Sequence, residues 1–156
     1  QQETLFPYTT LFRSAHNGHI RNGFREIDGH TDQSMGGHLK EKYGDEYYKI
    51  GFEFGKGSLR LDDHLAENDT AEFKEIKEGT AAEILNDVGE KYFLNLNCLS
   101  RPSRSSLMSR EIHSAGSYLH LGDVQNHYEL YDSKNEFDAL IFIGETEAAK
   151  EFEGQA

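Results

Sequence analysis

The sequence is poor in the residues that mark several classes of protein. Its 156 residues include one cysteine, two prolines and no tryptophan. The single Cys98 excludes an internal disulfide and a cysteine-based zinc site. No run of about 18 apolar residues is present, so we expect no membrane-spanning segment and no membrane partner. These features favour a cytoplasmic protein.

Positive charge is also scarce. The chain carries 16 basic against 28 acidic residues, which gives a formal net charge of −12. A nucleic acid is itself a polyanion and would be repelled by such a surface. We therefore expect no nucleic-acid partner.

We expect the first residues of the chain to differ in origin from the rest. Residues 4–14 (Thr-Leu-Phe-Pro-Tyr-Thr-Thr-Leu-Phe-Arg-Ser) match the translation of a common sequencing-library adapter. We expect residues 1–14 to be an artefactual leader, residues 15–149 to be the C-terminal part of a folded domain, and residues 150–156 to be a charged tail. Because the motif at residues 15–19 starts abruptly after the leader, we expect the rest of the domain to lie in sequence upstream.

Apolar periodicity predicts strands that alternate with helices. The predicted strands cover residues 47–54, 71–76, 92–97 and 137–144, and the predicted helices cover residues 34–43 and 80–88. Ser34 can cap the start of the first helix and Gly44 can end it. Thr80 can cap the second helix, with Glu83 as its capping-box partner. The Gly-Lys-Gly stretch at residues 55–57 is expected to break the first strand.

The last predicted strand carries most of the information about the fold. Residues 137–144 form a nearly continuous apolar run, which is typical of a strand buried on both faces of an α/β sheet. Residues 98–110, rich in serine and arginine, are expected to form a loop. The pattern as a whole predicts an α/β fold, with a partial, mostly parallel sheet, flanking helices and an incomplete domain.

Three stretches together resemble the erythromycin esterase family. They are residues 15–19 (Ala-His-Asn-Gly-His), 35–39 (Met-Gly-Gly-His-Leu) and 47–57 (Tyr-Tyr-Lys-Ile-Gly-Phe-Glu-Phe-Gly-Lys-Gly). Residues 137–143 also resemble the last strand of that family. The resemblance implies a hydrolase of the esterase type, whose named members open the lactone ring of macrolide antibiotics with an activated water and so confer resistance. We expect no cofactor.

The same resemblance implies site residues. His16 and His19 match the family's C-terminal pair of active-site histidines, which would position water or substrate and stabilise developing negative charge. The family's general base lies in a Glu-Ala-Thr-His-Gly stretch that this sequence does not contain, and we attribute that difference to the missing upstream part. The chain alone is therefore expected to be inactive.

Spacing and chemistry support the histidine pair less specifically. Two histidines three positions apart at the end of a strand can face one pocket, and imidazole titrates near neutrality, so either ring can act as acid, base or donor. A metal site is the rival interpretation of His16 and His19. Two histidines are too few for a metal, and no third ligand stands at diagnostic spacing, so we expect none.

Glu145 is the third candidate catalytic residue. It follows the last predicted strand at its C-terminal end, where sites collect in α/β sheets, and a carboxylate there can orient a histidine or contact substrate. The alternative is an acidic residue in the first turn of a following helix, where the helix dipole favours it.

The remaining histidines and the cysteine suggest structural roles. His38 is expected to be a surface or helix-packing residue. His113, His120 and His127 recur every seven residues, but glycines between them argue against one continuous helix, so we interpret the spacing as coincidence. Cys98 is expected to be a small, half-buried residue at the end of a strand.

Taken together, the sequence predicts a hydrolase that cleaves a macrolide lactone or similar small-molecule ester with histidine-activated water. Two alternatives remain open. One is a non-catalytic binding or scaffold domain with the same fold, because fold does not fix function. The other is a hydrolase of a different small ester metabolite.

Overall fold

The computed structural model describes residues 17–22, 24–27, 30–60, 70–113, 128–130 and 136–149, and the structural statements that follow concern these residues. The expected leader, the whole of the expected tail and His16 lie outside them. So do His120 and His127.

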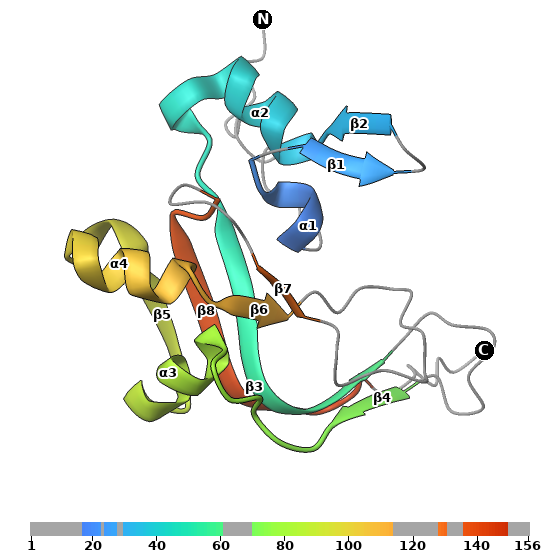
Figure 1. Ribbon diagram of the computed structural model, residues 1–156, viewed down its shortest axis with the longest axis vertical. Coiled ribbons are helices and arrows are strands. Elements are labelled where there is room, and N and C mark those ends of the chain that lie inside the picture. The colour runs from blue at the N-terminus through green and yellow to red at the C-terminus, as the bar shows by residue number, and fades with distance from the viewer. Residues whose placement is uncertain are drawn as a thin grey trace, which may run out of the picture.

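A mixed four-stranded sheet forms the centre of the described structure (Figure 1). Its strand order is β4 (Thr70–Phe73), β3 (Ile50–Arg60), β8 (Ala139–Thr146) and β5 (Lys91–Asn95). Two helices lie against it, α3 (Ala81–Val88) and α4 (Arg101–Met108). The predicted α/β class is confirmed.

Smaller elements complete the described structure. A short helix α1 (Asn17–Ile20), a hairpin of β1 (Phe24–Ile27) and β2 (His30–Gln33), and a helix α2 (Met35–Tyr43) are grouped beyond the end of the sheet where β3 begins (Figure 1). A second two-stranded sheet pairs β6 (Glu111–His113) with β7 (Tyr128–Leu130). Short 3-10 turns cover Gly44–Glu46 and Leu96–Cys98.

Strand direction differs from the expected mostly parallel sheet. Only the central pair β3 and β8 is parallel, while β4 pairs antiparallel with β3 and β5 pairs antiparallel with β8. The connection between β3 and β4, residues 61–69, is shorter than the dozen or so residues that a parallel crossover needs. Because β4 has already reversed the chain, the strand after α3 also runs against the central pair.

Local capping signals are largely confirmed. The Ser34 hydroxyl oxygen accepts a hydrogen bond from the Gly37 backbone N–H at 3.0 Å, and Gly44 follows α2 with a φ of 55°. At α3 the expected capping box is wrong in detail. The Thr80 hydroxyl donates to the carbonyl of Lys77 at 2.7 Å, and the Glu83 carboxylate accepts from the Gly79 N–H at 2.9 Å.

The Gly-Lys-Gly stretch does not break β3, which continues to Arg60. An ideal Cβ on Gly57 would lie 2.1 Å from the Thr146 carbonyl oxygen, and one on Gly55 would lie 2.5 Å from the Gly144 carbonyl oxygen. Gly57 also has a φ of 121°. These glycines let β3 approach β8 closely and turn toward β4, which is the usual role of glycine at a bend in a strand.

Residues 98–110 are mostly helical, so the expected loop is wrong. The Ser100 hydroxyl oxygen accepts from the Ser103 N–H at 3.3 Å, and Pro102 stands in the first turn of α4, where its missing N–H costs nothing. Arg104 ties the helix to the sheet by donating to the Phe137 carbonyl at 3.1 Å. Cys98, expected to be half-buried, is exposed.

The main core lies between the sheet and helices α3 and α4. Its largest fully buried side chains include Leu85, Leu96, Phe137, Leu140 and Phe142. The opposite face of the sheet is less covered by described residues, because Phe52 and Phe93 are 50% and 55% exposed. In β8 itself Ala139 is buried on this face, but Ile141 and Ile143 are only half-buried, so the expectation of a strand buried on both faces is met in part. No helix in the described ranges is long and apolar enough to cross a membrane.

Candidate functional site

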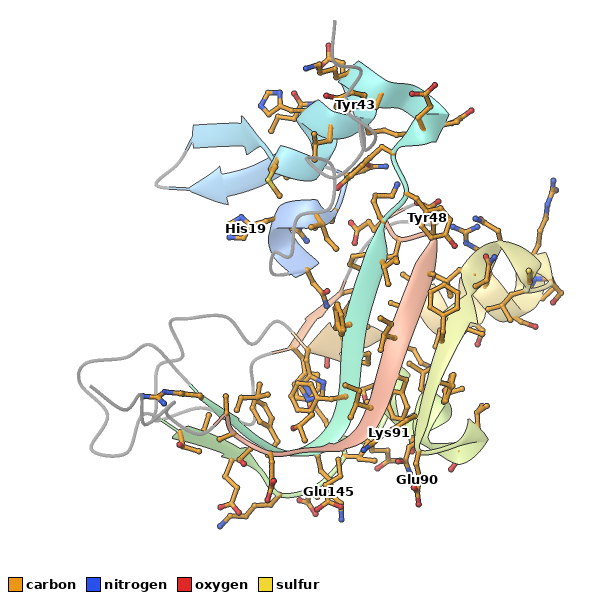
Figure 2. All side chains as sticks on the ribbon, turned by 180° about the vertical axis from the view of Figure 1, so that it is seen from behind. His19, Tyr43, Tyr48, Glu90, Lys91 and Glu145 are labelled. Carbon is orange, nitrogen blue, oxygen red and sulfur yellow. The ribbon has the colours of Figure 1, made fainter. Side chains whose placement is uncertain are left out.

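The candidate site predicted from the sequence centres on α1, which carries His19. The His19 side chain is exposed, and Figure 2 shows it on the side of α1 turned away from the sheet. His16, one residue before α1, is outside the described residues. The structure therefore places one histidine of the predicted pair, on a short helix whose position depends on its contacts at both ends.

Asn17 fixes the start of α1 to the sheet. Its side-chain Nδ2 donates to the carbonyl of Phe52 at 2.6 Å, and its Oδ1 accepts from the Phe52 N–H at 2.9 Å. Only 7% of Asn17 is exposed. A carboxamide offers one donor and one acceptor side by side, as the backbone of a neighbouring strand does. Asn17 thus takes the edge of β3 in the part that β4 leaves unpaired, since β4 pairs with β3 only from Gly57 onward.

The end of α1 is held by α2 and the segment after it. The Tyr47 hydroxyl donates to the carbonyl of Ile20 at 2.8 Å, and the Ser34 hydroxyl donates to the carbonyl of Arg21 at 2.6 Å. These bonds satisfy carbonyls that a helix leaves without partners at its C-terminus. Gly36 allows α2 to come this close, because an ideal Cβ on it would lie 2.0 Å from the Ile20 carbonyl oxygen. The two motifs that resemble the esterase family, residues 35–39 and 47–57, therefore supply contacts that hold α1 in place.

The contribution of Asn17 is testable by unfolding. We expect Asn17→Ala to lower the free energy of unfolding by about 1–3 kcal/mol, because it leaves both backbone groups of Phe52 without partners at a part-buried edge. Asn86→Ala, at an exposed position on α3, is the matched control and should change little. Urea unfolding followed by circular dichroism measures both. Equal stability of the two variants would contradict the role of Asn17.

Glu145 lies in a different part of the molecule from His19. It is part of β8, exposed, and its carboxylate is 3.9 Å from the Lys56 ammonium. Lys56 is its partner in register and stands four positions after Phe52, which places it roughly 13 Å further along β3 at about 3.3 Å per residue. Figure 2 shows His19 and Glu145 toward opposite ends of the central strands. The described structure does not bring these two predicted residues together, and the alternative of a helix starting at Glu145 is not observed, because β8 continues to Thr146.

A second cluster of ionisable groups was not predicted. Glu53, on β3, is 1% exposed and His113, on β6, is 3% exposed. The Glu53 carboxylate contacts the His113 ring through Nδ1 and accepts from the His113 backbone N–H at 3.1 Å. The expected coincidence of His113 with His120 and His127 stays untested, but His113 itself lies in a strand and not in a helix. A signal for Glu53 was present in the sequence, because it occupies an inward position of an alternating strand and a buried acid needs a partner.

Aromatic rings enclose the His113 imidazole. The Phe54 ring stacks on it with centroids 3.9 Å apart, and Phe73 meets it edge-on at 5.2 Å. The Tyr128 ring lies 4.3 Å away and is tilted by 40°. The imidazole therefore has one fixed orientation between Glu53 and these rings.

Burial raises the pKa of three tyrosines, Tyr47, Tyr92 and Tyr128, and the shift is large for the last two. Burial raises the pKa of Tyr92 to about 12. Burial and the negative charge of Glu53 together raise the pKa of Tyr128 to about 12, although the Lys77 backbone lowers it in part. The unfolded chain ionises these phenols near their ordinary value of 10.0. The stability that the neutral rings contribute is complete below about pH 10 and is lost as pH rises from there toward about pH 12.

This dependence gives a spectroscopic prediction. Tyr92 and Tyr128 should give tyrosinate absorbance only well above pH 10, or only when the protein unfolds. Tyr128→Phe should remove part of the late-ionising absorbance. Tyr48→Phe, at a residue that is 47% exposed, should not. A late component that is the same in both variants would show that Tyr128 ionises normally.

Comparisons with known proteins identify the class and the family. The fold is α/β, and a sequence model of the family described as erythromycin esterase matches residues 8–146. The chain belongs to the erythromycin esterase family, which is hydrolase-like. No curated protein matches the chain significantly. In the described ranges, no group of three or more His, Cys, Asp or Glu residues is placed to hold a metal ion.

Two solved structures have a similar fold. A protein from Bacillus cereus is 18% identical, with a TM-score of 0.60, and the match covers 85% of this chain and 32% of that one. A succinoglycan biosynthesis protein is 21% identical, with a TM-score of 0.67, and the match again covers 85% of this chain and 32% of that one. At this identity the likeness supports the fold alone. The chain spans about a third of the length of these two proteins.

Proposed function

We propose that the protein hydrolyses a carboxylic ester, a macrolide lactone or a similar small molecule, with histidine-activated water. The observation that supports this most is the family match, which includes both His16 and His19. The clamped position of α1 adds to it, because a helix fixed at both ends can hold His19 in one place. Glu145 is retained as a third candidate that acts apart from His19 or contacts substrate. We propose no metal or cofactor for this reaction.

The proposed reaction needs a base, a nucleophile and a group that stabilises an oxyanion. The base takes a proton from water, the water oxygen bonds to the carbonyl carbon, the bond from that carbon to the alkoxy oxygen breaks, and the alkoxy oxygen takes up a proton. His16 and His19 are assigned to positioning water or substrate and to donating hydrogen bonds to the developing oxyanion. The general base is assigned to sequence outside this chain. The complete reaction is accordingly proposed for the complete protein.

The test begins with DNA sequencing across the junction before Ala15, followed by expression of the complete protein. We expect His16→Ala and His19→Ala each to lower kcat/KM for ester hydrolysis by about 100-fold or more, since removing one donor to a developing oxyanion typically costs that much. His38→Ala, at an exposed position on α2, is the control and should keep the activity. The substrate panel should include macrolide lactones and simple esters of other chemistry.

The outcomes separate the three functional hypotheses. Turnover of macrolides that depends on His16 and His19 supports the proposal. Dependence on the same residues with only other esters supports the alternative metabolite hydrolase. A complete protein that binds such compounds without turnover favours a binding or scaffold domain. Turnover that is unaffected by both substitutions contradicts the roles assigned to His16 and His19.

A further inference from the structure

The arrangement of hydrogen-bond donors and acceptors around the His113 ring determines what this cluster can bind. The Glu53 carboxylate accepts from the backbone N–H of Phe54 at 3.0 Å and of His113 at 3.1 Å, and it contacts His113 Nδ1. An ionised carboxylate offers only acceptors, so the imidazole carries its hydrogen on Nδ1. In the neutral ring, Nε2 is then left as an acceptor.

Two buried polar atoms of this cluster have no hydrogen-bond partner of ordinary geometry among the described residues, although the Lys77 backbone N–H is near enough to the Tyr128 hydroxyl to lower its pKa. They are His113 Nε2 and the hydroxyl oxygen of Tyr128. His113 and Tyr128 are direct partners in the register of β6 and β7, and only 3% and 9% of them are exposed. Leaving such an atom unsatisfied costs about 1–3 kcal/mol, so buried polar groups of this kind normally have a partner.

Charges nearby restrict the chemistry of that partner. An anion is disfavoured because the negative Glu53 carboxylate and the lone pair of His113 Nε2 would both repel it. Among the residues that the structure describes, no free carboxylate lies here for a cation, because Glu111 is already paired with Lys77 at 2.7 Å. The Lys77 ammonium lies 4.6 Å over the Tyr128 ring. An apolar ligand would satisfy neither atom. The partner must be small, neutral and able to both donate and accept.

We propose that His113 and Tyr128 bind one buried water molecule, which donates to His113 Nε2 and accepts from the Tyr128 hydroxyl. This single ligand satisfies both atoms, and buried waters in proteins typically make about three hydrogen bonds to such groups. An imidazole held through Nδ1 by a carboxylate, with water on Nε2, is also arranged to take a proton from that water. The site is close to α1 along β3, because Glu53 follows Phe52, the residue that Asn17 holds. The inference concerns water binding and does not rest on the proposed ester hydrolysis.

Nuclear magnetic resonance on the uniformly 15N-labelled full chain tests this site. Long-range correlations of the His113 ring should show hydrogen on Nδ1 and none on Nε2. Cross-relaxation spectra should show a long-lived water next to the ring protons of His113. Both measurements use the unsubstituted protein, so they stand even if a variant fails to fold.

Tyr128→Phe and Tyr92→Phe form the matched pair of variants. Both tyrosines are largely covered, but the Tyr92 hydroxyl already donates to the Leu85 carbonyl at 2.6 Å. We expect loss of the water signal at His113 in Tyr128→Phe and no change in Tyr92→Phe. The proposal is overturned by hydrogen on Nε2, by a direct bond from the Tyr128 hydroxyl to Nε2 with no water signal, or by a water signal that persists unchanged in Tyr128→Phe.

Discussion

Gly36→Ala is expected to displace α1 from α2 and to lower the free energy of unfolding by about 3 kcal/mol, the upper range for overpacking a tight contact. The added Cβ would lie 2.0 Å from the Ile20 carbonyl oxygen and 2.3 Å from that of Arg21. These are backbone atoms, and the same two carbonyls accept the hydrogen bonds of Tyr47 and Ser34. Any shift that makes room for the methyl group therefore breaks contacts that hold α1.

Gly89→Ala is the control for this substitution. The nearest atom to an ideal Cβ on Gly89 is in the Tyr92 ring, at 3.8 Å. The φ of Gly89, 165°, is extended backbone that alanine adopts readily. Urea unfolding should separate the two variants clearly. In the complete protein, Gly36→Ala should also lower ester hydrolysis more than Gly89→Ala, because it moves the helix that carries His19. Equal stability of the two variants would show that α2 does not clamp α1.

Elements governed by local signals were predictable from the sequence. Helix α2 has its cap at Ser34 and its end at Gly44, so its limits follow from residues within the segment itself. Helix α4 was missed because its serines and arginines read as a polar loop, although Ser100 and Pro102 mark its start. Apolar periodicity could not reveal this helix, because its buried residues, Leu107 and Met108, stand only at its end.

Contacts between distant segments were beyond the reach of local patterns. The bonds between Asn17 and Phe52 join residues separated by 35 positions, and those between Glu53 and His113 join residues separated by 60. Strand direction depends on the same kind of information, because the reversal at β4 decides how β5 meets β8. Glu145 was placed near the histidines by the rule for parallel sheets, whereas the structure places it beside Lys56.

Glu53→Gln is expected to lower the free energy of unfolding by about 3 kcal/mol, within the range for breaking a buried, hydrogen-bonded pair. The carboxylate accepts from the Phe54 N–H, the His113 N–H and His113 Nδ1 through both of its oxygens. A glutamine amide replaces one oxygen by a donor. In either orientation at least one buried N–H group then faces another donor, even if the imidazole changes its tautomer.

Glu72→Gln, at an exposed position of β4, is the control and should stay within about 0.5 kcal/mol of the parent protein in urea unfolding. If Glu53→Gln were no less stable than this control, the contacts between Glu53 and His113 would not contribute the expected free energy of unfolding.

A double substitution separates the stability of the pair from its chemistry. Glu53→Met combined with His113→Leu removes the donors and acceptors of both side chains together, and apolar replacements of a buried pair are often neutral for stability. We expect the double variant to lower the free energy of unfolding as well, because the backbone N–H groups of Phe54 and residue 113 lose the acceptor that Glu53 supplies. Urea unfolding measures this loss beside that of Glu53→Gln. A double variant as stable as the parent protein would show that these two N–H groups do not need the carboxylate of Glu53.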